Sequence, residues 1–214
     1  MPADQDTPRG RRSLDKGRME AFSDGVFAFA ATLLVADLAL GHGSSALQQV
    51  LHAWPGYVAY IISFLTIGAA WLAHTALTDR LALADPLLMR LNLLLLLAVV
   101  FLPFPTKLIA EYLQHTSGER VYVTLYGLTL LAIRVLGSAL DAYARHEHLY
   151  SPHEDGEEPQ DAPPKKLLPI VIGYVIAILI GLAAPQAAVA LYFGLAVYLI
   201  VPFREVGRLL FRRL

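Results

Sequence analysis

Cysteine is absent from the 214 residues, and charged side chains make up only 16% of them. Without cysteine the chain has no disulfides, zinc–thiolate sites, iron–sulfur clusters or thiol nucleophiles. A soluble domain is about one quarter charged, so this chain has too little polar surface for an ordinary soluble protein. It also lacks phosphate-binding glycine loops, hydrolase and zinc-protease motifs, and the Thr-Val-Gly-Tyr-Gly potassium filter. We therefore expect no enzyme, no metal or other cofactor, and no nucleic-acid partner.

Hydrophobic residues, by contrast, make up 56% of the chain, and the mean hydropathy is +0.52. They gather into runs of about 20 residues, close to the length that spans a bilayer core of about 30 Å as a helix. A helix is expected for each run, because backbone amides in hydrocarbon must be hydrogen-bonded within the chain. The six runs cover residues 19–40, 54–77, 87–110, 121–143, 167–184 and 187–203.

The 17 lysines and arginines are distributed unevenly between these runs. Six crossings with both termini on one side place 14 of them on that side and two, Lys107 and Arg120, on the other, while Arg134 lies within the fourth run. Basic residues accumulate on the cytoplasmic side of membrane proteins. The distribution predicts an all-α membrane protein with six transmembrane helices and cytoplasmic N- and C-termini.

The predicted order is a basic cytoplasmic segment (1–17), four transmembrane helices (18–149), a linker (150–166), two further transmembrane helices (167–205) and a basic tail (206–214). The linker is acidic and proline-rich, which is typical of a solvated cytoplasmic connection. His146 and His148 lie just before the linker, and His153 lies within it. Histidine spacing in an acidic loop is a weak metal signal, so we expect these residues to be solvated.

A carboxylate, Asp24, lies near the start of the first run, between Ser23 and Gly25. Ionisable residues at membrane depth usually face a protein interior or a water-filled path. The alternative is an acidic residue at a helix N-terminus, stabilised by the helix dipole. A 3.6-residue period also predicts one stripe on this helix, and such a stripe is typical of helix packing as well as of a pore lining. The stripe comprises Phe22, Gly25 or Val26, Phe29, Thr32 or Leu33, and Ala36.

The second run carries a companion stripe of Ser63, Ile67, Trp71, His74 and Thr78. Its spacing predicts that Trp71 and His74 share a helix face, at the same depth as Asp24. A buried contact between Asp24 and His74 would satisfy both groups and join the two helices. An interfacial histidine beside an interfacial tryptophan is the alternative.

Arg134 is isolated in the fourth run. A voltage sensor needs a series of arginines along one helix, so that function is excluded. We expect Arg134 to pair with Asp141 or to extend towards the membrane surface.

The sequence Phe22-Ser23-Asp24-Gly25-Val26-Phe27, preceded by Arg18, forms a motif in the first run. Further matching residues are Ser63, Phe64, Trp71 and His74 in the second run, and Asn92 with Phe101-Leu102-Pro103-Phe104 in the third. Together these residues resemble the transmembrane protein 175 family, which comprises lysosomal potassium channels and their bacterial homologues. The resemblance covers about the first half of the chain.

The resemblance implies a homotetramer of six-helix subunits in which the first helix of each subunit lines a central pore. Rings of apolar side chains then gate the pore and select cations, in place of a carbonyl filter. By position, the constrictions are Phe29, Leu33 and Ala36, and Thr32 contributes to selectivity. The structural motif and interhelical network comprise Arg18, Phe22, Ser23, Asp24, Trp71 and His74.

These observations predict a potassium-selective, multi-pass channel of the plasma membrane, whose partners are its own copies, the lipid bilayer and permeant potassium ions. Two other functions fit the same residues. One is a proton-coupled secondary transporter that uses Asp24 and His74, and the other is a non-conducting membrane scaffold whose stripes only pack. Single-channel currents would exclude the transporter, and the complete absence of a potassium current would exclude the channel.

Overall fold

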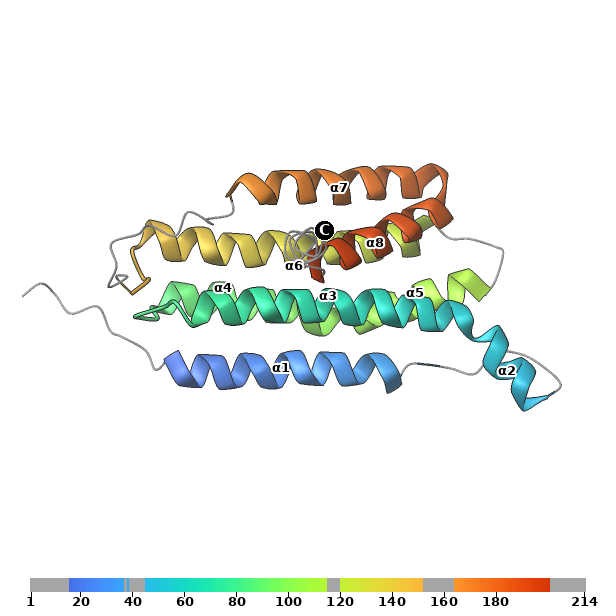
Figure 1. The fold of residues 1–214 in the computed structure, drawn as a ribbon, viewed down its shortest axis with the longest axis horizontal. Coiled ribbons are helices and arrows are strands. Elements are labelled where there is room, and N and C mark those ends of the chain that lie inside the picture. Colours follow the sequence, from blue (N-terminus) through green and yellow to red (C-terminus); the bar gives the residue numbers. More distant parts are fainter. Residues whose placement is uncertain (1–15, 37, 39–44, 115–119, 152–163, 201–214) are drawn as a thin grey trace, which may run out of the picture.

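The computed structural model describes residues 16–36, 38, 45–114, 120–151 and 164–200. Within them the fold is helical, and most helices run along one common axis (Figure 1). One isolated β-bridge, between Leu81 and Tyr150, joins two loops. The helices are α1 (Lys16–Ala36), α2 (Ala46–His52), α3 (Trp54–Thr78), α4 (Pro86–Phe101), α5 (Pro103–Gln114), α6 (Arg120–His146), α7 (Pro164–Ala183) and α8 (Pro185–Ile200).

Local sequence signals explain where several helices begin. Asp85 caps α4 by accepting a hydrogen bond from the Leu88 amide at 2.7 Å, and Pro86 follows at the first helical position. Ser45 caps the short α2 in the same way, through the Gln48 amide. α2 lies in the connection between the first two predicted runs, where no helix was predicted.

The third predicted run, 87–110, is divided into two helices at Leu102 and Pro103. Proline donates no backbone hydrogen bond, so Pro103 and Pro105 interrupt the helical ladder. Leu102 keeps a right-handed helical conformation, and α4 and α5 therefore continue in one direction as a bent helix. Within the described part of the chain, residues Pro86–Glu111 form one of four segments that are long and apolar enough to span a membrane.

The other three such segments are α1, α3 and α6, which confirms that the first four predicted runs are apolar helices. The last two predicted runs coincide with α7 and α8, which are apolar but shorter. Most of the predicted linker and the two terminal segments lie outside the described residues.

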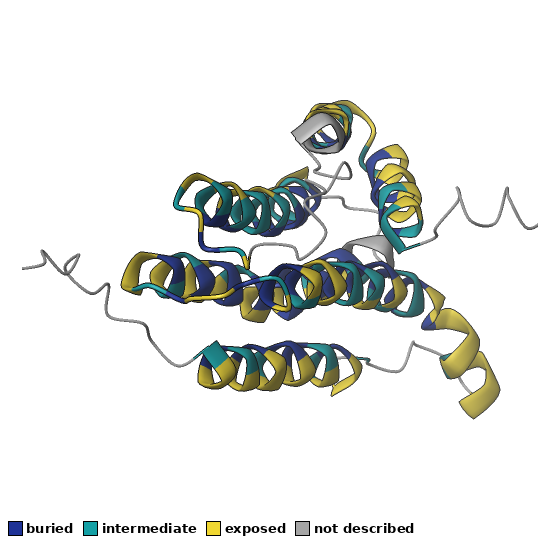
Figure 2. Ribbon diagram, turned by 60° about the vertical axis from the view of Figure 1, so that its left-hand side comes forward, coloured by how far each residue is buried: buried dark blue, intermediate teal, exposed yellow. Residues whose placement is uncertain are grey.

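α3 lies inside the bundle, between α1 on one side and α6 to α8 on the other (Figure 1). α1 packs against α3, α4 and α5, whereas α7 packs against α6 and α8. Buried residues lie mainly on the helix surfaces that face into this bundle, and the surfaces of α1 and α7 that face outwards are exposed (Figure 2). The arrangement therefore leaves α1 at the edge of the subunit.

The loop 79–85 and the segment 147–151 form a clasp at one end of the bundle. The Ala82 amide donates to the Leu149 carbonyl, and the Ser151 amide donates to the Arg80 carbonyl, both at 2.9 Å. The Tyr150 hydroxyl donates to Asp141 at 2.6 Å. Burial is the main cause of the raised pKa of Tyr150, and the hydrogen bond to the Asp141 carboxylate raises this pKa further. The Tyr150 hydroxyl therefore keeps its proton and remains a hydrogen-bond donor. Tyr150, the first residue of the predicted linker, is thus part of the folded bundle.

Gly127 is a position where α6 needs the smallest side chain. A β-carbon there would lie 2.7 Å from Ile178 Cγ1 and still closer to the hydroxyl of Tyr192. Tyr192 is fully buried and packs against Tyr126, with ring centroids 5.7 Å apart, so it has no free space to move into. α6 can therefore approach α7 and α8 closely only with glycine at this position.

We expect Gly127→Ala to lower the free energy of unfolding by about 1–3 kcal/mol, because the added methyl group overpacks the contact with Tyr192. Gly137→Ala on the same helix is the control, since a β-carbon there meets no atom within 4 Å. The control should be neutral or stabilising by up to about 1 kcal/mol through helix propensity. Denaturant titration in detergent micelles measures both, and equal effects would contradict the packing argument.

Candidate functional site

α1 has one face inside its own bundle and one face outside it. Phe27 is 2% exposed, whereas Phe29, two residues later, is 57% exposed. Because successive residues of a helix are rotated by about 100°, these two side chains point to opposite sides. The buried residues of α1 are Met19, Ser23, Phe27, Ala30 and Leu34.

The residues predicted to form pore constrictions lie on or beside the exposed face of α1. Phe29, Thr32 and Ala36 are exposed, and Leu33 is half-buried at the edge of this face. The Thr32 hydroxyl donates to the Phe29 carbonyl at 2.8 Å, so it is hydrogen-bonded within its own helix. The exposed face therefore consists mainly of apolar side chains whose own chain does not cover them.

The buried face of α1 is attached to α3 and α4 by a chain of hydrogen bonds. The Ser23 hydroxyl donates to the Met19 carbonyl at 2.8 Å, and it accepts from Asn92 Nδ2 at 2.9 Å. Asn92 Oδ1 lies 2.8 Å from His74 Nε2. An amide oxygen only accepts, so His74 Nε2 is the donor and the whole chain runs in one direction. We call His74, Asn92 and Ser23 the α1 relay.

Asp24 lies outside the α1 relay. Its carboxylate accepts a hydrogen bond of 2.9 Å from the indole nitrogen of Trp71, and both side chains are exposed. The expected contact between Asp24 and His74 is therefore replaced by two others, Asp24 with Trp71 and His74 with Asn92. The reason is helical rotation, because Ser23 and Asp24 point in directions about 100° apart. Only Ser23 faces His74 and Asn92.

The remaining residues of the predicted motif, Arg18 and Phe22, are exposed on α1. His74 is buried and packs against Phe27, with ring centroids 5.5 Å apart. The structure thus brings Ser23, Asp24, Trp71 and His74 together at one end of α1 and α3, and Asn92 completes the set.

A second buried hydrogen-bond chain joins α3 to α5 and α6. Tyr126 donates to Ser63 at 2.8 Å, Ser63 donates to Thr106 at 2.7 Å, and Thr106 donates to the Leu102 carbonyl at 2.7 Å. The direction follows because the Thr106 proton is used on the carbonyl, which leaves its oxygen as an acceptor for Ser63. We call Tyr126, Ser63 and Thr106 the α6 relay. Of these three residues only Ser63 was predicted from the sequence, although hydroxyl groups within long apolar runs are a usable signal for interhelical hydrogen bonds.

These features define a multi-spanning helical membrane protein whose first helix is hydrogen-bonded on one face and exposes an apolar face on the other. Residues 18–103 match the family described as the endosomal/lysosomal potassium channel TMEM175. The chain is 36% identical over 202 residues to "Potassium channel B446_29190" of Streptomyces collinus, an alignment that covers 90% of this chain and 98% of that protein. The chain belongs to the TMEM175 family.

Two further relatives extend this comparison. The crystal structure of a lysosomal potassium-selective channel TMEM175 homolog from Chamaesiphon minutus has a TM-score of 0.73 and 32% identity, covering 86% of this chain and 95% of that one. The endosomal/lysosomal proton channel TMEM175 of Gallus gallus is 37% identical over 118 residues, 50% of this chain and 23% of that protein. The predicted family is confirmed, and membership in a family of ion channels confirms that the chain is not an enzyme.

We expect Asn92→Leu to destabilise the protein by about 1–3 kcal/mol, because the buried N–H of His74 loses its acceptor. Trp71→Phe is the comparison variant, since it removes an exposed hydrogen bond at the same end of α3. Trp71→Phe should change the free energy of unfolding by no more than about 0.5 kcal/mol through loss of this bond. Denaturant unfolding in detergent micelles compares the two, and a larger loss for Trp71→Phe would show that the exposed bond is the stronger one.

Proposed function

We propose that this protein is a potassium-selective channel of the plasma membrane, built as a homotetramer with α1 of each subunit lining a central pore. The observation that carries the proposal is the exposed apolar face of α1. A continuous exposed apolar face is typical of a helix that meets lipid or another subunit. The relay on the opposite face holds α1 in one orientation, as a pore-lining helix requires.

The names of the relatives favour potassium as the permeant ion. The Streptomyces collinus protein, 98% of which is covered, is named a potassium channel, and the Chamaesiphon minutus homolog is described as potassium-selective. The Gallus gallus protein, which is named a proton channel, is matched over only 23% of its length. The chain thus matches potassium channels over nearly their whole length.

In the proposed tetramer Phe29, Leu33 and Ala36 form stacked apolar rings around the pore axis. A ring narrow enough to exclude water forces an ion to lose part of its hydration shell, and potassium loses water more readily than sodium. The same ring can close the pore by dewetting. Phe29 and Ala36 are exposed and available for such rings, and the Thr32 side chain lies between them on the same face. Arg18 and Phe22, which belong to the motif, then lie near one end of the pore.

The proposed subunit has six transmembrane helices and cytoplasmic termini. Basic residues support this orientation, because Lys16, Arg80 and Arg145 lie at the clasp end of the bundle, and Lys16 Nζ approaches the Asp79 carbonyl at 3.4 Å. α8 has 16 residues and so rises about 24 Å, enough to cross a bilayer that thins slightly around it. The N-terminus of α1, the clasp and the start of α7 then share one side of the membrane.

Purified protein in planar bilayers should carry single-channel currents. With opposing potassium and sodium gradients, the reversal potential should lie near the potassium equilibrium potential, and an imposed proton gradient should shift it little. The absence of potassium current at every voltage and pH tested would refute the proposed channel. A reversal potential that follows the proton gradient would identify a proton pathway instead.

Leu33→Ser should raise the single-channel conductance several-fold and reduce the preference for potassium over sodium, because a polar ring hydrates the constriction. A barrier lowered by about 1.4 kcal/mol corresponds to a tenfold faster passage. Val35→Ser is the matched control, because Val35 lies at a similar depth on the other edge of the exposed face of α1. Unchanged permeation in Leu33→Ser, or equal changes in both variants, would remove Leu33 from the pore.

A further inference from the structure

A cavity of about 360 Å³ lies between α3 and α6, with α7 and α8 closing part of it. Its α3 wall consists largely of small apolar side chains, including Ala70 and Ala73. Its α6 wall combines apolar residues with four polar ones, Arg134, Ser138, Asp141 and Arg145. The cavity is separate from the exposed face of α1, and the proposed pore does not use it.

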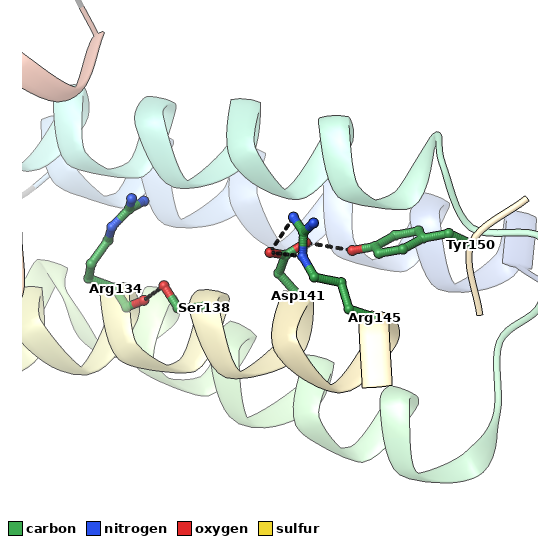
Figure 3. A network of polar contacts seen from close by, with 5 residues as sticks. All are labelled: Arg134, Ser138, Asp141, Arg145 and Tyr150. Carbon is green, nitrogen blue, oxygen red and sulfur yellow. Dashed lines mark hydrogen bonds and ion pairs between the residues drawn. The ribbon is translucent and has the colours of Figure 1, made fainter. Parts of the chain in front are cut away.

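Arg134 is the unusual member of the α6 wall, because it lies in the middle of a helix that spans Arg120–His146. Its Nε atom is buried and has no hydrogen-bond acceptor in the part of the chain that the structure describes. The expected pairing of Arg134 with Asp141 is not seen among the described contacts of Asp141. Instead, Arg145 binds Asp141 through two nitrogens, at 2.9 and 2.8 Å, and Tyr150 donates to it as well (Figure 3).

The charges around the cavity leave a positive excess. Arg134, Asp141 and Arg145 lie on one side of α6, and Figure 3 shows the Arg134 guanidinium extending away from α6, apart from the Asp141–Arg145 pair. Arg80, from the loop that follows α3, lines the same cavity and lies over the Tyr150 ring, 4.4 Å from its centroid. Three guanidinium groups and one carboxylate therefore line the cavity, and Arg145 and Tyr150 already bind that carboxylate.

Arg134 is half-buried, and a guanidinium at membrane depth is costly unless a counter-charge reaches it. The Ser138 hydroxyl does not provide one, because it donates to the Arg134 carbonyl at 2.9 Å. The guanidinium fork matches the geometry of an oxyanion, which it binds through two parallel hydrogen bonds. We propose that this cavity binds a phosphate group, held by Arg134 and attracted by Arg80 and Arg145.

Two sources can supply this group. A free phosphate enters from the aqueous side at the clasp, whereas a phospholipid headgroup enters from the membrane with its acyl chain along the apolar α3 wall. Both place the same phosphate oxygens at Arg134. The volume of the cavity and its alanine-rich wall accommodate either ligand.

The full-length protein in micelles of dodecyl maltoside, a detergent that has no phosphate group, provides the test. Equilibrium binding of radiolabelled inorganic phosphate measures the free source, and native mass spectrometry after addition of phosphatidylglycerol measures the lipid source. We expect one phosphate group per subunit and binding at least tenfold weaker in Arg134→Gln. Arg120→Gln, which changes an exposed arginine on the same helix, should bind like the unchanged protein.

Binding of inorganic phosphate, or of phosphatidylglycerol alone, with this variant pattern supports the proposal and identifies the source. No binding of either probe, or equal binding by Arg134→Gln, overturns it.

If Arg134→Gln does not fold, Ala70→Leu fills the cavity without removing a charge. Loss of binding in Ala70→Leu supports the site, and retained binding overturns it. These assays do not depend on ion conduction, so they fail or succeed independently of the channel proposal.

Discussion

Two chains of buried hydrogen bonds meet on α3, and the arrangement of the other helices depends on them. His74 connects α3 through Asn92 to Ser23, and Ser63 connects α3 to Thr106 and Tyr126. In lipid the hydrophobic effect does not favour one rotation of an apolar helix over another. Polar contacts and close packing must therefore specify how each helix is rotated against its neighbours. The direction of each chain leaves every hydroxyl proton in it with one acceptor, and both chains end on a backbone carbonyl.

The α1 relay also decides which face of α1 remains free. Ser23 is attached to Asn92 on one side of the helix, and this places Phe29 on the other side, outside the bundle. Rotation of α1 by one residue, about 100°, would separate Ser23 from Asn92 and turn the apolar face towards lipid or towards α3. The buried bond and the proposed pore lining are therefore two consequences of one helix orientation, and Asp24 with Trp71 supports that orientation from the exposed side.

Sequence analysis identified the residues of the motif but not their pairs. Depth along the helices placed Asp24, His74 and Trp71 at one level, which the structure bears out. Depth does not specify the rotation of α1 about its axis, however. A rotation by one residue decides whether Asp24 or Ser23 faces Asn92 and His74. Thr106 and Tyr126 were missed because their partner, Ser63, is at least 43 residues away in the chain. The bend at Pro103 was also not predicted. Proline is a local signal for such a bend, but the apolar run continues on both sides of Pro103 and was predicted to form one helix.

The sequence by itself determined that this chain belongs in a membrane and which apolar runs become helices. Those features follow from the chemistry of neighbouring residues, because lipid forces each apolar run to satisfy its own backbone. Only the tertiary structure decided the partners of His74 and Asp24, the free face of α1 and the cavity beside Arg134. Each of these depends on the rotation of one helix about its axis relative to another, which contacts between residues far apart in the chain determine.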